Sequence, residues 1–418
     1  MPQTQQTSDP VYLDHAATTP AAPEVVRTLA EASEHCFGNP SSAHGFGTRS
    51  QRALEDAREF LRGALGAASV VFTGSGSEAD MLGVTGAAWM RPPGRALAAA
   101  SDHPAILAQS TVLARTKVSR GGVHKVPVTR HGDIDPEALF DHLGPDVRVV
   151  SLLYGHNELG TIPDLEESVE VIRRVAPECH IHVDLVQAFG KVPFDLAEID
   201  VDSVAVSAHK IHGPKGVGAL GLAHRAKVAP ITPAGGQEHG LRGGTQDVPG
   251  AVAFAAAAER ALSSHTHTAA HTEALAARMM DRLATAFPDA ERLGNPARRL
   301  PHILSVRIPG VNGETLVQRC AKRGVACSAG AACHGAGEQE GDKAKGHDNH
   351  VLHAIGLDRR TARTVVRFSF ARTNTMAEVE HAAELVAEEA LALDALAVRP
   401  RKSSRRASGS TPLATRTR

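Results

Sequence analysis

The segment HIHVDLVQAFGKVPFDLAEIDVDSVAVSAHKIHGPKGVGALGLA, residues 180–223, holds the short apolar runs that decide the fold class. The runs are HIHVDL (180–185), DSVAVS (202–207) and GALGLA (218–223). Each is too short for a helix of ordinary length and is rich in β-branched or small residues, which favours a strand. Runs that are apolar almost throughout are typical of strands buried on both faces of a sheet.

Similar runs lie further upstream, and helical stretches alternate with several of them. SVVFT (69–73) and RVVSLL (148–153) have the same β-rich character, and DLEESVEVIRRV (164–175) is predicted to form a helix between two strands. Buried runs that alternate with helices are typical of an α/β domain around a mostly parallel sheet. We predict that fold class for the larger part of the chain.

Further helices are predicted on both sides of this region. PEVVRTLAEASEH (23–35) has a proline in its first turn, and TRSQRALEDAREFLRGAL (48–65) has apolar residues at helical spacing on one face. Residues 251–262 and 267–287 are also expected to be helical. The region 302–393 is predicted to contain a strand, a helix, a loop, a second strand and a final alanine-rich helix, which is a compact α+β pattern.

These patterns divide the chain into four parts. They are a polar arm (1–10), a large α/β domain (11–262), a smaller α+β domain (263–395) and a basic tail (396–418). We expect that the first residues of the large domain can pack with the smaller one. The tail is rich in Ser, Thr and basic residues and has no apolar period, so it is predicted to be disordered.

The composition of the 418 residues limits the class of function. With 22% charged residues and a formal net charge of -1, the chain gives no electrostatic reason to expect a nucleic acid or a membrane surface as its main partner. The basic tail has no aromatic residues on which bases could stack, which also argues against nucleic acid. No run approaches the roughly 20 apolar residues of a membrane span, and the N-terminus lacks the apolar stretch of a secretory signal. Because the five cysteines are odd in number, free thiols in a reducing compartment are favoured, and we expect the cytoplasm.

A glycine-rich turn follows the first of the buried runs. In FTGSGSEAD (72–80), glycines allow close approach to the backbone, Ser77 offers a hydroxyl, and the following helix N-terminus favours an anion. These features suit a phosphate group. A strand-to-helix turn of this composition can equally be only a tight connection.

Two charged residues stand where buried strands end. Asp184 at the end of HIHVD is costly unless it meets a cation, such as the protonated ring nitrogen of a pyridoxal 5'-phosphate (PLP) cofactor. Its alternative role is that of a helix N-cap. Lys210 follows a strand in VSAHKIHGPKG, where a lysine inside a site can form a Schiff base. Lys215 is the competing lysine, but its Gly-Pro-Lys-Gly setting predicts an exposed turn, and a plain basic loop is the alternative for the whole segment.

Three of the five cysteines lie within fourteen residues of one another near the C-terminal end of the chain. In CSAGAACHG (327–335), the small neighbours of Cys333 leave its thiol accessible, as a nucleophile requires. One alternative is a metal site from Cys320, Cys327, Cys333 and His334, although the spacing fits no CxxC pattern. The other alternative is an inert buried thiol, which is the role expected for Cys320 and Cys327.

The order of these segments is more specific than any one of them. From about residue 11 to 390 the chain resembles the cysteine desulfurase and selenocysteine lyase family of PLP enzymes. The segments that carry the resemblance are YLDHAATTP, FGNPSSAHGFG, VFTGSGSEAD, SDHPAIL, HNELGTI, HVDLVQAFGK, SAHKIHGPKG, GGQEHGLRGGTQDVPG, GAACH and VRFSFART. The resemblance implies a fold type I PLP-dependent transferase of the class V aminotransferase kind, with a large domain and a smaller C-terminal one.

The resemblance also implies a cofactor role for individual residues. Lys210 would carry PLP as a Schiff base, His103 would stack on its ring and act as an acid or base, Asp184 would pair with the ring nitrogen, and Gln187 would bond the phenolic oxygen. The phosphate would be bound by Gly76, Ser77, Ser207 and His209 and, from the neighbouring subunit, by Thr245. A homodimer with shared sites is therefore expected.

On the substrate side, the resemblance implies a carboxylate clamp and a nucleophile. Arg367 would bind the substrate carboxylate, with Asn157 and Asn39 as further substrate-binding residues, and Cys333 would take the sulfur. The implied reaction converts L-cysteine to L-alanine with a persulfide on Cys333, from which an acceptor protein receives the sulfur. No metal is expected. Departures from the usual pattern at His15, Met81, His212, His239 and Gly243 leave the subgroup open.

Two other functions remain open at this point. One is a lyase of the same fold that acts on selenocysteine, or a desulfinase that acts on cysteine sulfinate. The other is a catalytically idle member that serves only as a partner-binding subunit. Against it argues the presence of the residues that the chemistry needs, namely Lys210, His103, Asp184, Gln187, Cys333 and Arg367.

Overall fold

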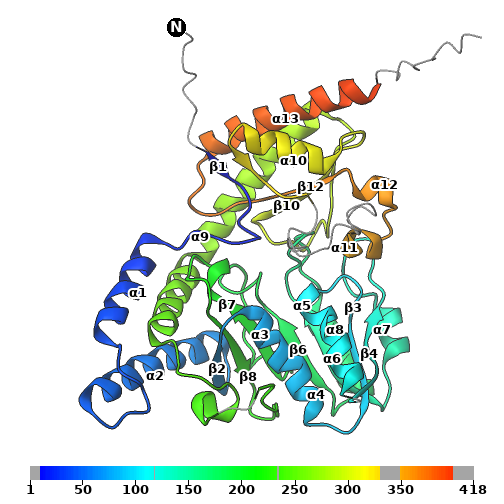
Figure 1. Cartoon of the computed structure of the whole chain (residues 1–418). Coiled ribbons are helices and arrows are strands. Elements are labelled where there is room, and N and C mark those ends of the chain that lie inside the picture. Colours follow the sequence, from blue (N-terminus) through cyan, green and yellow to red (C-terminus); the bar gives the residue numbers. More distant parts are fainter. Residues whose placement is uncertain (1–9, 117, 233–234, 330–348, 399–418) are drawn as a thin grey trace, which may run out of the picture.

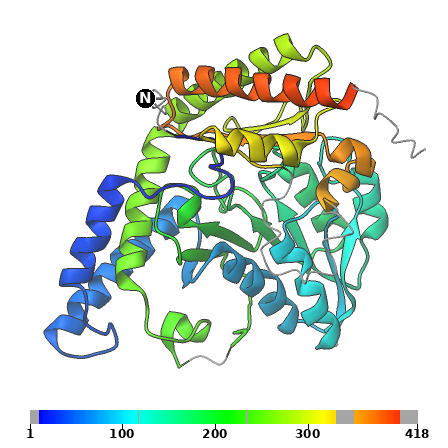
Figure 2. The ribbon, with the colours of Figure 1, turned by 45° about the horizontal axis from the view of Figure 1, so that its top comes forward.

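Two sheets of different size organise the chain. The computed structural model describes residues 10–116, 118–232, 235–329 and 349–398. A seven-stranded sheet with its helices forms the larger part, a three-stranded sheet with its helices forms the smaller part, and the long helix α9 (Val248–Ala286) runs beside both (Figures 1 and 2). The arrangement is the predicted α/β fold with a smaller α+β part.

The large sheet is mostly parallel. Its strands lie in the order β2 (Ser69–Thr73), β8 (Gly218–Leu222), β7 (Ser203–Ser207), β6 (His180–Asp184), β5 (Val147–Leu153), β3 (Gly94–Ala99) and β4 (Ser119–Val126). Strand β8 runs antiparallel to β2 and β7, and the other pairings are parallel. The five predicted runs all form strands. The sequence did not reveal β3 and β4, because GRALAA is alanine-rich and SRGGVHKV contains two glycines and three basic or imidazole side chains, all of low β propensity.

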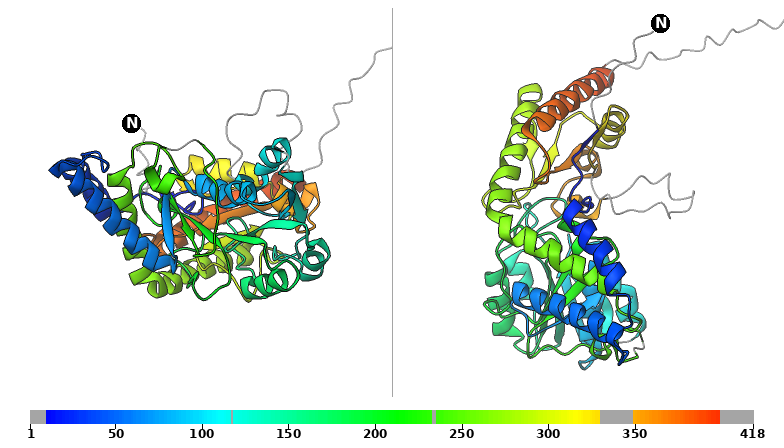
Figure 3. Two further views of the ribbon diagram at one scale, coloured as in Figure 1. Left: turned by 90° about the horizontal axis from the view of Figure 1, so that it is seen from below. Right: turned by 90° about the vertical axis from the view of Figure 1, so that its left-hand side faces the viewer.

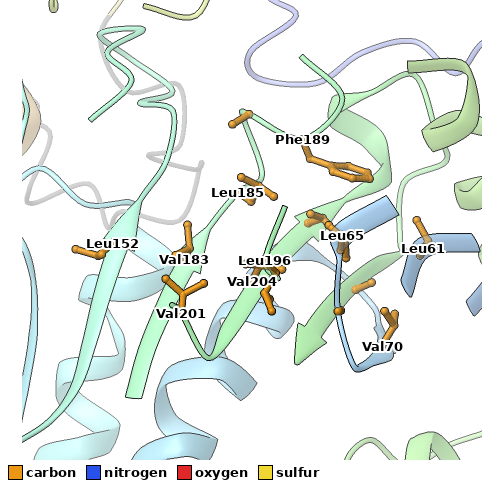
Figure 4. Close-up of a cluster of buried hydrophobic side chains, with 14 of the residues drawn as sticks. Leu61, Leu65, Val70, Leu152, Val183, Leu185, Phe189, Leu196, Val201 and Val204 are labelled. Atoms are coloured by element: carbon orange, nitrogen blue, oxygen red, sulfur yellow. The ribbon is translucent and has the colours of Figure 1, made fainter. Parts of the chain in front are cut away.

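Both faces of this sheet are buried, as the continuous apolar runs predict. Alternate residues of a strand point to opposite faces, and on β2 the side chains of Val70 and Phe72 join one apolar cluster while Val71 joins another. The first cluster, part of which Figure 4 shows between β6, β7 and the end of α2, also takes in Val183 and Val204. A sheet covered in this way is rigid, so residues at the ends of its strands are held in fixed positions.

The predicted helices form with small shifts of their ends. They are α1 (Pro23–His35), α2 (Gly45–Leu65) and α8 (Leu165–Val175), and the side chain of Asp164 caps α8 by accepting the backbone N–H of Glu167. The two stretches predicted at 251–262 and 267–287 are a single helix, α9, because no glycine or proline interrupts residues 251–286. The predicted domain boundary at residue 262 therefore falls inside a continuous helix, and it stays a prediction.

The smaller part is built around β10 (Ile303–Arg307), which lies between β12 (Val365–Ser369) and β9 (Glu291–Arg292) in antiparallel pairings. Helices α10 (Gly313–Lys322) and α13 (Met376–Val398) pack with it (Figure 1). The N-terminal strand β1 (Val11–Tyr12) pairs with β11 (Val325–Ala326), so the first described residues pack with this smaller part. Helix α13 continues to Val398, into the segment predicted as a tail, and residues 399–418 lie outside the described residues.

The remaining elements are short and mostly connect the strands. They are α3 (Gly76–Met81), the π-helical turn η1 (Leu82–Gly86), α4 (Ala87–Trp89), α5 (Pro104–Leu107), α6 (Gln109–Arg115), α7 (Pro136–His142), the 3₁₀ turns η2 (Ala208–Lys210) and η3 (Gln237–Gly240), α11 (His350–Ala354) and α12 (Arg359–Ala362). Viewed from the side, the larger and smaller parts lie one above the other, and α9 runs past both of them (Figure 3). Within the described ranges, none of the helices has the length and apolar character needed to cross a bilayer.

Candidate active site

The predicted cofactor residues come together where the parallel strands of the large sheet end. Asp184 is the last residue of β6, Ser207 is the last residue of β7, and η2, which carries His209 and Lys210, follows directly. Strand β2 runs in the same direction as β7 and leads into the turn that holds Gly76. In α/β folds, ligands bind at this carboxyl edge of the sheet, and the edge here has the required polar groups.

Lys210 is held by backbone oxygens of the N-terminal segment. Its Nζ donates to the carbonyl oxygens of Ala16, at 2.7 Å, and Ala17, at 2.8 Å. The side-chain amide of Gln187 donates to the same oxygen of Ala16, at 2.8 Å. Lys210 and Gln187 thus lie side by side at the backbone oxygen of Ala16. Their predicted roles, as the Schiff-base lysine and the partner of the phenolic oxygen of PLP, need such an arrangement.

Asp184 and His103 face each other in the interior. Carboxylate and imidazole atoms of Asp184, His103 and Asp80 all lie within 4.8 Å of one another. Asp184 is 4% exposed and accepts the N–H of Val186 at 2.9 Å, so it fixes the turn after β6 as well as facing the site. Burial raises the pKa of Asp184. This effect is partly offset by His103, by the N–H of Val186 and by Lys210, all of which lower the pKa.

His103 has a defined tautomer. It is the N-cap of α5, and its Nδ1 accepts the N–H of Ala105 at 3.1 Å, so a neutral ring carries its proton on Nε2. Burial lowers the pKa of His103, Asp184 opposes that effect, and Lys210 and His350 add to it. A neutral imidazole with its proton on Nε2 therefore lies beside the buried carboxylate.

The turn between β2 and α3 forms a narrow cradle. A Cβ atom at Gly76 would lie only 2.8 Å from Cγ2 of Val186 and 3.2 Å from Cβ of Ser207, so the close approach requires glycine. The Oγ of Ser207 is buried and has no hydrogen-bond partner among the described residues. His209 contacts the hydroxyl of Thr18 through Nδ1 at 3.1 Å, and burial lowers the pKa of His209 to about 4. Ser77, by contrast, is exposed on the first turn of α3.

The substrate side centres on a buried arginine. Arg367, on β12, is 3% exposed and donates through Nη2 to Oδ1 of Asp14 at 2.8 Å and through Nη1 to the backbone oxygen of Asn157 at 3.0 Å. Its Nε is buried and has no partner among the described residues. Arg367 and Asn157 therefore lie together as predicted, although Asn157 contributes its carbonyl group to this contact.

Cys333 lies outside the described residues, but the structure defines both flanks of its segment. On one side, Ser328 pairs with Arg367 in an isolated β-bridge, with N···O distances of 3.1 and 2.7 Å. On the other side, Asn349 donates to Oε2 of Glu158 at 2.7 Å, and His350 lies 3.0 Å from the backbone oxygen of Asp102. Both flanks thus contact residues that adjoin the site, next to Arg367, Asn157 and His103.

The other cysteines of this region are part of the core. Cys320 is fully buried and Cys327 is 9% exposed. A hydrogen bond with the neighbouring thiol lowers the pKa of Cys320 and raises that of Cys327. Their burial suits the inert role predicted for them. The alternative metal site also needs Cys333 and His334, which lie outside the described residues.

Asn39 and Thr245 are placed differently from the other candidates. Both are exposed. Asn39 accepts the N–H of Ser41 in the loop between α1 and α2, which projects from the side of the molecule away from the edge where β7 ends (Figures 1 and 3). Thr245 lies just before α9. Their roles stay predictions that a single chain cannot test.

With this geometry established, the chain can be compared with known proteins. It matches the model of the family "Aminotransferase class-V" over residues 11–381. The chain belongs to this family. It is 38% identical to a cysteine desulfurase of Frankia sp. (strain EuIK1) over 399 residues, which cover 92% of each protein. Among solved structures, it is similar to a NifS-like protein (32% identity, TM-score 0.82, 91% of this chain and 98% of that one) and to SspA in complex with cysteine (26% identity, TM-score 0.72, 87% and 100%).

Class V aminotransferases depend on PLP, and the residues of this site fit that cofactor. The unpartnered hydroxyl of Ser207 beside the cradle at Gly76 suits a phosphate oxygen, and the buried carboxylate of Asp184 suits a protonated ring nitrogen. Lys210 offers a side-chain amine of the kind that can bind PLP covalently. These residues all lie at the carboxyl edge of one sheet, which is where ligands bind in α/β folds.

Several polar residues of the site were not singled out in the sequence. Asp14 pairs with Arg367, Asp102 is fully buried beside His103, and Lys191 donates to Oε1 of Gln187 at 3.3 Å. Burial, with the charge of Lys210, lowers the pKa of Lys191 to about 7. Asp14 and Lys191 both stand in segments that carry the family resemblance, YLDHAATTP and HVDLVQAFGK, which was the available indication.

Proposed function

We propose that the chain is a PLP-dependent cysteine desulfurase that converts L-cysteine to L-alanine and transfers the sulfur to Cys333 as a persulfide. The observation that carries the proposal is the β-bridge between Ser328 and Arg367. Cys333 is five residues beyond Ser328, and five extended residues span at most about 18 Å. The thiol of Cys333 is thus tethered within about 18 Å of the β-bridge that holds Arg367, whose guanidinium suits a substrate carboxylate.

The substrate would be oriented by Arg367. Asp14 and the carbonyl of Asn157 hold its guanidinium in one position. A guanidinium binds a carboxylate with two parallel hydrogen bonds, so the amino acid would be fixed in orientation as well as in place. The Frankia relative is a cysteine desulfurase, and the similar structure of SspA is a complex with cysteine, which favours L-cysteine as the amino acid.

The proton transfers are assigned to Lys210 and His103. When bound, PLP supplies an electron sink that makes the Cα proton of the amino acid acidic. The amine of Lys210 would take that proton, and His103, neutral because burial lowers its pKa, would hold or donate the proton on Nε2, since Nδ1 accepts the N–H of Ala105. The Cys333 thiolate would then attack the substrate sulfur, so that the S–S bond forms as the C–S bond breaks with its electron pair left on Cβ. A proton added to Cβ, and the proton returned to Cα by Lys210, would complete alanine, which leaves.

Finer points of the proposal rest on the resemblance. The exposed Thr245 would complete the phosphate site of a second subunit, so we propose a homodimer. A separate acceptor protein would take the persulfide sulfur from Cys333, and the free thiols favour the reducing cytoplasm as the place of reaction.

The deciding experiment is product release by the purified protein supplied with L-cysteine and a reductant, beside Cys333→Ala. Equal amounts of sulfide and alanine from the wild type, and loss of sulfide in the variant, are expected. Cys36→Ala is the matched control, because Cys36 is a half-buried thiol outside the site, and it should retain full turnover.

The same assay separates the other functions. Selenide release from L-selenocysteine without turnover of L-cysteine would identify a selenocysteine lyase. Turnover of cysteine sulfinate that is indifferent to Cys333 would identify a desulfinase. A colourless protein that cannot be reconstituted with PLP would identify an idle subunit and would refute the proposal.

A further inference from the structure

A continuous chain of buried polar side chains leads through the large sheet to the site. Nη2 of Arg91 lies 3.4 Å from Nδ1 of His180, and Nε2 of His180 lies 2.8 Å from Oγ of Ser203. The same Oγ lies 2.8 Å from Nδ1 of His182, whose Nε2 lies 3.2 Å from Oδ1 of Asp80. His180, Ser203 and His182 are fully buried and Asp80 is 2% exposed. We call these five residues the histidine chain.

The hydrogen bonds of the histidine chain can point in only one direction. Burial lowers the pKa of His180 and of His182 to about 3, so both rings are neutral and each carries one N–H. Arginine can only donate, which makes Nδ1 of His180 an acceptor. Nε2 of His180 then donates to Ser203, the Ser203 hydroxyl donates to His182, and Nε2–H of His182 donates to Asp80. The reverse order would set an N–H of His180 against an N–H of Arg91.

The backbone makes room for this arrangement. A Cβ atom at Gly83 would lie 2.3 Å from Nδ1 of His182, so only glycine leaves space for the ring. Gly83 belongs to the π-helical turn η1, which directly follows the helix that carries Asp80. Such turns are rare and are frequent at functional sites.

Asp80 joins the histidine chain to the cofactor side of the site. Its carboxylate lies within 4.8 Å of Asp184 and His103, and Asp102 is the other acid that acts on it. Two buried carboxylates at this distance cannot both ionise freely, so the pair holds a proton more tightly than either would alone. Burial and the charge of Asp184 raise the pKa of Asp80 accordingly. Because Oδ1 of Asp80 accepts from His182, a proton on Asp80 would lie on Oδ2.

We propose that Asp80 is a positioning residue that acts through Asp184, and that the histidine chain fixes it so that the two carboxylates together supply and retain the proton on the ring nitrogen of PLP. This inference rests on the proposed function. The proton balance needs no further reactant: one proton leaves the carboxylate pair and joins the ring nitrogen when the neutral pyridine binds, which leaves two carboxylates beside one cation. Asp80 thereby strengthens the electron sink on which the proposed reaction depends.

The test compares two cofactors, without using activity. PLP and its 1-deaza analogue, in which C–H replaces the ring nitrogen, are titrated into the cofactor-depleted protein, and the ratio of their dissociation constants is measured. Asp80→Asn should weaken the binding of PLP about tenfold and leave the binding of the analogue unchanged. Only PLP carries the positive charge that a hydrogen-bonded carboxylate stabilises. Ser203→Ala, which removes the link between the two imidazoles, should shift the same ratio about threefold. His182→Gln, which keeps a donor toward Asp80, should stay within about twofold of the wild type.

Thr85→Ala is the matched control. Thr85 is fully buried in the same π-helical turn and donates to Gln109 instead of to the histidine chain, so its loss should leave the ratio unchanged. Equal weakening of both cofactors by Asp80→Asn would mean that Asp80 only stabilises the fold, and the inference would be wrong. Failure of the wild type to bind PLP would refute the proposed function instead. Tight binding with no turnover of L-cysteine would refute the desulfurase and leave the role of Asp80 intact.

Discussion

The cofactor side and the substrate side of the site are assembled in different ways. Asp184, Ser207 and Lys210 stand within 27 residues of one another, at or just after the ends of two adjacent strands. On the substrate side, Arg367 is joined to Asp14 across 353 residues of sequence and to Asn157 across 210. The first set is fixed by one rigid sheet, whereas the second depends on how the two parts of the molecule pack.

Because of this difference, substitutions on the two sides should have different effects. A sheet buried on both faces holds its strand ends in place even when one side chain changes, so a loss on the cofactor side should be chemical and local. A contact made between parts of the molecule is lost whenever either part shifts, so changes on the substrate side should alter substrate binding and leave the cofactor bound. The following variants test this contrast.

The largest effect is expected for Lys210→Ala. The variant lacks the amine that binds PLP and moves the Cα proton, so turnover of L-cysteine should fall by roughly a thousandfold or more. Borohydride reduction followed by mass spectrometry should find the cofactor mass on the peptide of residue 210 only in the wild type. Lys215→Ala removes an exposed lysine of the same segment and should behave as the wild type. A cofactor mass on the peptide of residue 210 in Lys210→Ala would contradict the assignment.

The effect of burial on Lys191, on the cofactor side, can be measured through the pH dependence of the free energy of unfolding. Its pKa is lowered from 10.5 to about 7 by burial and by Lys210, so between these two pH values the unfolded chain binds a proton that the folded chain does not. Wild-type stability should therefore rise with pH on account of this group, and Lys191→Met lacks that rise. The difference in the free energy of unfolding, variant minus wild type, should fall from pH 7 to 10 with a slope approaching about 1.4 kcal/mol per pH unit. A difference that is independent of pH, measured by denaturant unfolding, would show that Lys191 has an ordinary pKa in the folded protein.

On the substrate side, Arg367→Lys should lower kcat/KM for L-cysteine by about a hundredfold, mainly through KM. A lysine cannot bind a carboxylate through two parallel hydrogen bonds, and it cannot contact Asp14 and Asn157 together. The affinity for PLP, followed by its visible absorption, should not change. Arg372→Lys is the control, because Arg372 lies beyond the same strand and pairs with Glu24. A loss of PLP in Arg367→Lys would mean that the two sides are not independent.

Gly76→Ala probes the space on the cofactor side. The added Cβ would overlap Cγ2 of Val186 and press on Ser207, which narrows the phosphate cradle. We expect PLP affinity to fall about tenfold, with KM for L-cysteine unchanged at saturating cofactor. Gly63→Ala is a matched control, because a Cβ there meets no atom within 4 Å. Unchanged PLP affinity would show that the phosphate binds away from Gly76.

The same contrast explains which features the sequence could reveal. Asp184, Ser207 and Lys210 follow apolar runs whose strand character is local, so their meeting at one sheet edge could be predicted. The partnership of Arg367 with Asp14 could not, because no local pattern records a contact between segments that are hundreds of residues apart. Nor could the histidine chain, since His180 and Ser203 lie in separate predicted strands and nothing in the sequence shows that their side chains point toward each other. Strands β3 and β4 were missed because their residues form strands only with the support of the rest of the sheet.

The smallest effect is expected where the far flank of the Cys333 segment is fixed. Asn349 caps α11 by accepting the N–H of Leu352 at 3.0 Å and donates to Glu158 at 2.7 Å. Asn349→Ala should cost about 1 kcal/mol of local stability. If the substrate side depends on such contacts, the variant should also raise the KM for L-cysteine about threefold to fivefold. Asn312→Ala removes an equivalent cap, that of α10, outside the site, and it should lower stability without changing KM. If both variants changed KM equally, the flank would contribute only general stability, and the contrast between the two sides would not extend to this segment.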